Sequence, residues 1–179
     1  AGLTVAGDID IDGTTNLDVV DVDGAVNFAA DVTFADGADI ITASAGASNF
    51  RAGVNAGNSI ESGGNYNVVV GDGAGTAITT GDNNTFIGTS SGDATTTSNS
   101  NTAVGSQSLT ANTTGAGNVG MGMGALAANT TASFNTAVGY GSLDANTTGA
   151  SNVALGSNAL GVNTTAANNV AIGTNALDA

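Results

Sequence analysis

Residues 101–118 read Asn-Thr-Ala-Val-Gly-Ser-Gln-Ser-Leu-Thr-Ala-Asn-Thr-Thr-Gly-Ala-Gly-Asn, and the final asparagine begins the same pattern again. This asparagine recurs every 17 residues from Asn67 to Asn169 without an insertion. A short fixed period of this kind indicates that each unit is one structural element stacked on an identical neighbour. The repeat therefore predicts an all-β solenoid or β-roll with 17-residue coils rather than a globular domain.

Three residue types keep step in the repeat, and we assign them to structural columns. Gly75 and Gly92 take the place of the leucine in the first two units. The asparagines are Asn67, Asn84, Asn101, Asn118, Asn135, Asn152 and Asn169; the glycines are Gly71, Gly88, Gly105, Gly122, Gly139, Gly156 and Gly173; the leucines are Leu109, Leu126, Leu143, Leu160 and Leu177.

Each column has an expected role. Stacked asparagines can hydrogen-bond their amides to the units above and below, as Asn ladders do. Glycine supplies a tight corner after the apolar strand residue. The leucine is expected on a second short strand or a turn, facing the same core as the strand valine and isoleucine.

The segment Asn-Thr-Ala-Val-Gly predicts a strand in which Thr102 and Val104 point one way and Ala103 the other. Neither face carries a charge, which is typical of a strand that is buried on both faces. A solenoid covers only one face of its strands. We therefore expect other chains to cover the second face, and the short coil favours a flattened two-strand roll with several chains side by side.

The chain divides into three zones. Residues 1–45 are Asp-rich, with short alternating runs such as Val20 and Val22 that predict short strands. Residues 46–66 lose the pattern and are interpreted as a junction with room for a short helical turn. Residues 67–179 form the repeat zone.

Composition excludes several functions. The net charge is −14, and Arg51 is the only Lys or Arg, so nucleic acid and anionic membranes are not expected partners. No apolar run is long enough to insert in a membrane. The chain has no His, Cys or Lys for acid–base or nucleophilic chemistry, and no Asp pair stands out as a glycosidase pair. We expect no enzyme activity, no catalytic residue and no cofactor.

Calcium is the one metal that the sequence brings into question. Residues 8–13 match the opening of a calcium loop, but Val19 stands where such a loop needs a bidentate Glu. Calcium shared between chains remains an alternative to a solvated acidic surface, which we favour, and we assign no metal ligand. The carboxylates concerned are Asp8, Asp10, Asp12, Asp21 and Asp23.

Asn-Thr-Thr recurs at 112–114, 129–131, 146–148 and 163–165. It matches the N-glycosylation acceptor pattern, but we interpret it as a turn whose side chains bond the local backbone. The stacked threonines also leave open an ice-binding solenoid, which we consider less well supported than a polar surface facing solvent.

The run Asn135-Thr-Ala-Val-Gly-Tyr-Gly-Ser-Leu-Asp-Ala-Asn-Thr-Thr-Gly149 resembles the repeats of bacteriophage tail-fibre proteins and related bacterial surface fibres. Asn169-Val-Ala-Ile-Gly173 is similar, more loosely, to the head repeats of trimeric autotransporter adhesins. The resemblance implies a parallel homotrimeric β-roll in an extended fibre, located on a virion or at a cell surface. It also implies a stiff spacer that can contact a host glycan or protein, with an adhesin head as the alternative. Because the chain starts at Ala1, we expect a processed product or a piece of a longer protein.

Overall fold

The computed structural model describes residues 45–178. These residues belong to the unit formed by residues 40–179. The predicted Asp-rich strands before residue 45 and the calcium alternative at Asp8, Asp10, Asp12, Asp21 and Asp23 lie outside the described residues.

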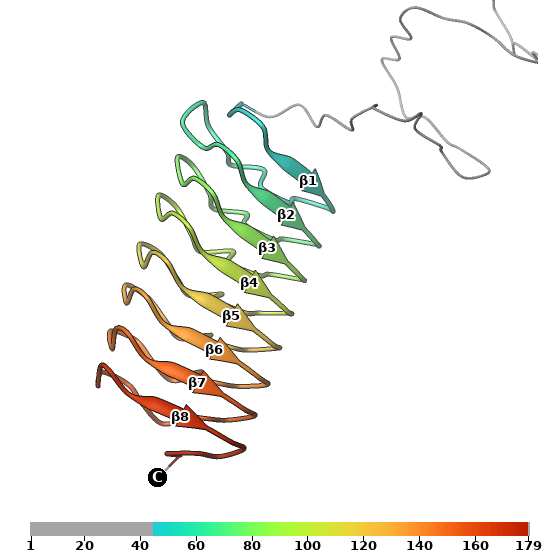
Figure 1. Ribbon diagram of the computed structural model, residues 1–179. Coiled ribbons are helices and arrows are strands. Elements are labelled where there is room, and N and C mark those ends of the chain that lie inside the picture. Colours follow the sequence, from blue (N-terminus) through green and yellow to red (C-terminus); the bar gives the residue numbers. More distant parts are fainter. Residues whose placement is uncertain (1–44, 179) are drawn as a thin grey trace, which may run out of the picture. The chain divides into compact units, whose positions relative to one another are not determined.

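The described part of the chain is a parallel β-solenoid that contains no helix. Every coil contributes one short strand, and the strands lie side by side in chain order (Figure 1). The eight strands are β1 (Phe50–Ala52), β2 (Val68–Val70), β3 (Thr85–Ile87), β4 (Thr102–Val104), β5 (Val119–Met121), β6 (Thr136–Val138), β7 (Val153–Leu155) and β8 (Val170–Ile172).

The strands pair in register along the whole stack. Thr85 of β3 pairs with Thr102 of β4, and Val104 of β4 pairs with Met121 of β5. This register is the 17-residue repeat expressed in space, because each residue lies beside its equivalent in the next coil. The predicted fold class, an all-β solenoid with coils of this length, is confirmed.

Between strands the coil returns through turns, and residues 45–178 contain no second strand in any coil. The expectation of a flattened two-strand roll is therefore wrong for these residues. Of the two places expected for the leucine, the turn is the one found. Leu109 has a backbone φ of 54°, in the left-handed region that no strand adopts.

The solenoid begins one coil before the regular repeat. Residues 49–66, within the segment interpreted as a junction, form a coil whose strand β1 pairs with β2. Asn49 and Gly53 occupy the asparagine and glycine places, but 18 residues separate Asn49 from Asn67. The extra residue shifts the phase of this coil, which is why the sequence pattern breaks here.

The central residue of each strand from β2 to β8 points into the solenoid, and from β4 onward this residue is small. Ala103 and Ala137 are fully buried, and Leu109 packs in the same core cluster. The residues on either side of each central strand residue point outward. The leucine therefore shares its core with the central strand alanine, and the expectation that it faces the strand valine and isoleucine is wrong.

Candidate functional site

The first Asn column runs through the interior of the stack and consists of Asn67, Asn84, Asn101, Asn118, Asn135, Asn152 and Asn169, with Asn49 above it. Each asparagine donates hydrogen bonds to the asparagine of the preceding coil. The backbone N–H of Asn84 donates to Oδ1 of Asn67 at 2.9 Å, and Nδ2 of Asn84 donates to the carbonyl of Ser98 across the coil at 2.9 Å.

These bonds give the first Asn column two functions. The backbone bond joins successive coils, and the side-chain bond closes most coils across their cross-section, whereas Nδ2 of Asn101 donates to the hydroxyl of Ser98 instead. Buried amides with all their partners are far less costly than unpaired ones. The first Asn column therefore fixes both the stacking register and the width of the solenoid.

The corner glycines, Gly71, Gly88, Gly105, Gly122, Gly139, Gly156 and Gly173, end each strand. Their φ angles lie between 122° and 135°, a region that side-chain-bearing residues rarely adopt. A Cβ on Gly105 would lie 2.6 Å from the carbonyl carbon of Gly122 in the next coil. Glycine is therefore needed both for the turn and for the close approach of successive coils.

A second Asn column, Asn112, Asn129, Asn146 and Asn163, shares acceptors with the first, because the carbonyl of Ala132 accepts from Nδ2 of both Asn118 and Asn129. Nδ2 of Asn129 donates to Oδ1 of Asn112 at 3.0 Å and to the carbonyl of Ala132 at 3.0 Å. Asn112, Asn129 and Asn146 are fully buried, so these acceptor sequences cannot carry a glycan in this fold. The predicted bond to local backbone is present, but the column itself was missed because Asn-Thr-Thr is typical of a surface turn.

The two threonines after each of these asparagines differ. The first donates its hydroxyl to the next coil, as Thr113 Oγ1 does to the carbonyl of Thr130 at 3.0 Å. The second, exemplified by Thr114 and Thr131, is exposed. The stack thus presents a single outer file of threonine hydroxyls.

The outward side chains of the eight strands form a surface that we call the strand face. It contains no charged residue, and its second file is entirely apolar. The first file is Phe50, Val68, Thr85, Thr102, Val119, Thr136, Val153 and Val170; the second file is Ala52, Val70, Ile87, Val104, Met121, Val138, Leu155 and Ile172.

The strand face is open to solvent in the single chain. Exposed fractions are 43% for Met121 and 46% for Leu155 within the sheet, and 68% for Ile172 in the last strand. Large exposed side chains border it on both sides: Phe134 lies just before β6, and Met123 and Tyr140 follow the corners after β5 and β6. A continuous apolar surface of this kind is typical of an interaction site.

No charged side chain of residues 45–178 belongs to the strand face, although the exposed Asp72 follows the corner after β2 at the place equivalent to Met123. Arg51, the central residue of β1, donates from Nε to the carbonyl of Ala56 at 2.7 Å. Oδ1 of Asp93 accepts a bond from the Thr110 hydroxyl at 2.8 Å. Burial raises the pKa of Asp144 above its ordinary value, its backbone hydrogen bonds with Ala145 and within Asp144 lower it, and the charge of Asp178 raises it further.

Within residues 45–178, no group of three or more His, Cys, Asp or Glu side chains is placed to hold a metal ion. Nor does this part of the chain contain a helix with the length and apolarity needed to cross a bilayer.

The fold and its surfaces define a parallel β-solenoid repeat protein with 17-residue coils, two internal asparagine columns and one uncovered apolar sheet face. Comparison with models of protein families, with curated proteins and with solved structures found no match.

Proposed function

We propose that this chain is a structural module of an extended filament, a tail fibre or comparable extracellular fibre, in which copies pack through the strand face. The observation that carries the proposal is the apolar strand face outside a solenoid whose interior is already filled. Eight strands spaced about 4.8 Å apart make this face roughly 35 Å long. Large continuous apolar patches on soluble proteins mark interaction sites.

The mechanism is mechanical. In-register hydrogen bonds join each coil to the next, and burial of the strand faces joins neighbouring chains along their length. The result is a stiff spacer that holds an attachment surface away from its anchor. We propose three parallel copies, because cyclic symmetry keeps the chain axes aligned and because the tail-fibre resemblance implies a trimer.

Light scattering on the purified chain tests this assembly. We expect a mass near three times the 16.9 kDa of one chain. Val138→Asp places a charge in the centre of the strand face and is expected to dissociate the assembly, because an unpaired charge is costly to bury. Thr131→Asp is the matched control, since Thr131 lies on the exposed threonine file. A folded, monodisperse monomer of the unmodified chain would refute the proposal.

An adhesin head that binds matrix or glycan remains the alternative, and the exposed Phe134 and Tyr140 favour keeping it. A glycan array discriminates between the two, because a pure spacer binds no glycan. An ice-binding role is disfavoured because the hydroxyls of one of the two threonine files donate to backbone carbonyls within the solenoid. We therefore expect no thermal hysteresis.

A further inference from the structure

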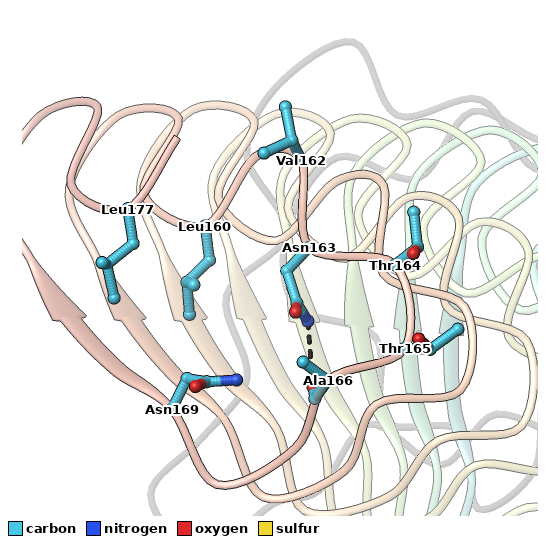
Figure 2. A pocket seen from close by; sticks show the side chains of 8 residues that line it. All are labelled: Leu160, Val162, Asn163, Thr164, Thr165, Ala166, Asn169 and Leu177. Carbon is cyan, nitrogen blue, oxygen red and sulfur yellow. Dashed lines mark hydrogen bonds between the residues drawn. The ribbon is translucent and has the colours of Figure 1, made fainter. Parts of the chain in front are cut away.

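A partner has access only to the outer surfaces of the described coils, because the side chains of each coil fill its interior. Figure 2 shows how these side chains divide: Leu160 and Asn163 point inward, whereas Val162 points outward. Leu126 and Leu143 are likewise fully buried inside the stack. Contacts with another molecule therefore depend on the strand face and on the residues that border it.

Two rows of residues border the strand face, one at each end of the strands. We call the row that precedes the first Asn column the entry edge, and the row that follows the corner glycines the exit edge. From β2 to β8 the entry edge is Tyr66, Asn83, Ser100, Gly117, Phe134, Ser151 and Asn168; the exit edge is Asp72, Thr89, Ser106, Met123, Tyr140, Ser157 and Thr174. Because the strands pair in register, successive members of each edge lie about 4.8 Å apart.

Phe134 is an unusual residue for the entry edge. Its φ is 61°, in the left-handed region that bulky residues rarely adopt. Leu109 has a similar φ, but its side chain is fully buried, whereas that of Phe134 is 69% exposed. Packing within the chain therefore covers little of the Phe134 ring. An unfavourable conformation without such compensation is typical of a residue that has a function.

The ring of Phe134 lies against the preceding coil. A Cβ on Gly117 would be 2.9 Å from Cδ1 and 3.0 Å from Cε1 of Phe134, so only glycine leaves room for the ring there. Gly117 is the one glycine of the entry edge. The ring thus spans the levels of β5 and β6, and the exit edge carries the exposed Met123 and Tyr140 at these two levels.

The two edges match level by level. At four levels both edge residues are polar and uncharged: Asn83 with Thr89, Ser100 with Ser106, Ser151 with Ser157, and Asn168 with Thr174. Phe134 shares its level with Tyr140, and Gly117 shares its level with Met123. Within one chain the edges lie at opposite ends of the strands and do not meet. The match is useful only where the entry edge of one copy meets the exit edge of the next.

The strand face by itself does not define how two copies align along the stack. Its second file is apolar in every coil, so a shift by one coil still places apolar residues on apolar residues. Surfaces without such distinctions specify their register only weakly. An aromatic side chain that has one matching place on the next copy supplies the missing distinction.

We propose that Phe134 of one copy inserts between Met123 and Tyr140 of the next copy and thereby fixes the axial register of the assembly. The inference rests on the proposed packing of copies through the strand face. Aromatic pairs and methionine–aromatic contacts are both favourable. Cyclic symmetry about the axis of the stack brings unlike edges together at equal levels, whereas an antiparallel copy would bring the entry edge against itself. Phe134 and Tyr140 then serve contact between copies rather than glycan binding.

Disulfide cross-linking tests the register without changing the aromatic residues. The chain contains no cysteine, so Ser151→Cys with Ser157→Cys introduces one thiol on each edge at the same level. The three residues of β7 between them span about 10 Å, more than the ~7 Å between Cα atoms that a disulfide tolerates. Cross-links therefore form between copies. We expect covalent dimers and trimers of the 16.9 kDa chain under mild oxidation, which a reductant returns to single chains.

Two variants serve as controls for the cross-link. Ser100→Cys with Ser157→Cys places the thiols three coils apart, a shift of about 14 Å along the stack, and should give no covalent product. Ser151→Cys alone should also give none, because the entry edge of one copy does not face the entry edge of another. Equal cross-linking in the pair that is three coils apart, or covalent dimers from the single variant, would overturn the register and polarity.

Phe134→Asn tests whether the ring itself contributes. Asparagine occupies the same place at Asn83 and Asn168 and adopts a positive φ readily, so circular dichroism should show unchanged strand content. We expect the concentration at which the assembly dissociates to rise by at least about tenfold, as for a buried aromatic anchor. Thr131→Asn, outside both edges, is the control and should leave this concentration unchanged.

The outcomes separate this proposal from the one on which it rests. A monomer of the unmodified chain by light scattering would overturn both. An assembly in which the Ser151→Cys and Ser157→Cys pair gives no covalent product, or in which Phe134→Asn dissociates at the same concentration as the control, overturns the role of Phe134 and leaves packing through the strand face intact.

Discussion

Two regions of the solenoid share one backbone path but fill their core differently. In the coils around β2 and β3 the large core side chain is on the strand, whereas from β4 onward it is on the turn. In the early coils the central strand residues are large, Val69 and Phe86, and glycines stand at the leucine place. In the later coils the central residues are small, such as Ala137, and leucines such as Leu143 fill the core from the turn. The comparison teaches that total core volume is conserved, while the position that supplies it is free to change.

The two regions meet at a column that changes its chemistry. Ile78, Thr95 and Asn112 occupy equivalent places in successive coils, which takes the column from apolar to polar. Thr95 Oγ1 is the buried side-chain atom of residues 45–178 that has no hydrogen-bond partner. The second Asn column therefore begins with an imperfect junction.

The largest expected effect comes from the corner, which both regions share. Gly105→Ala in a later coil should destabilise the fold by more than about 4 kcal/mol, because its Cβ would meet the next corner and its φ is 131°. Gly71→Ala in an early coil should cost a similar amount. Urea unfolding followed by circular dichroism measures both.

Gly124→Ala is the control for the corner. Gly124 also has positive φ, but a Cβ there meets nothing within 4 Å. Its cost should stay near about 1 kcal/mol. Equal destabilisation by Gly105→Ala and Gly124→Ala would show that steric contact between corners plays no part.

The volume exchange predicts a rescue. Phe86→Ala should cost about 3–4 kcal/mol through the cavity that it leaves. Gly92→Leu alone should also destabilise, because a Cβ on Gly92 lies 2.6 Å from the Phe86 ring. The double variant gives an early coil the side-chain pattern of the later coils. Its loss of unfolding free energy should therefore be smaller than the sum of the two single losses by at least about 1 kcal/mol. Strict additivity in a double-mutant cycle would contradict conserved core volume.

The column of Ile78, Thr95 and Asn112 predicts a smaller effect, in which one substitution stabilises the fold. Thr95→Val keeps the shape and removes an unpaired hydroxyl, so stability should be unchanged or higher by up to about 1 kcal/mol. Asn112→Leu should instead cost about 2 kcal/mol, because Nδ2 of Asn129 loses its acceptor on Asn112. A destabilising Thr95→Val would mean that the hydroxyl has a partner after all.

The smallest effect concerns two aspartates at equivalent places. Asp93 in an early coil has Thr110 beneath it, whereas Asp144 has Gly161 beneath it and Asp178 one coil further. The folded state raises the pKa of Asp144, so it binds the proton more tightly than the unfolded state does. Its contribution is therefore fully present below the ordinary pKa and is lost as pH rises through the raised value.

Asp144→Asn removes this dependence. Above the raised pKa the variant should be slightly more stable than the unmodified chain, by about 1 °C in melting temperature. The advantage should vanish on acidification below the ordinary aspartate pKa. Melting curves across this pH range provide the measurement, and a lower melting temperature at neutral pH would contradict the sign.

Much of the fold could be predicted from sequence because its strictest requirements fall on few residue types. The position of Gly105 and its equivalents requires a backbone conformation that only glycine adopts readily. The position of Asn101 and its equivalents requires a side-chain amide that both donates and accepts hydrogen bonds. These demands recur in every coil and so appear as a period. The strand positions followed from the same two columns.

The remaining features had no comparable signal. Alternation in Thr-Ala-Val shows that the faces differ but not which face is inside, and the alanine face is inside because Leu109 fills the core from the turn. The second Asn column was hidden because Asn112 is in a sequence typical of surface turns. The first coil was hidden because one extra residue breaks its phase.

The most direct test of the account is the solvent accessibility of the strand face in the purified, folded protein. The chain contains no cysteine, so single cysteines introduced by Val138→Cys and Thr131→Cys report only those two places. Both side chains reach solvent in a lone chain. If other copies cover the strand face, thiol labelling of the Val138→Cys variant should be slower by at least about a hundredfold, as expected for burial that opens only by dissociation. Similar labelling rates at the two places would contradict the account.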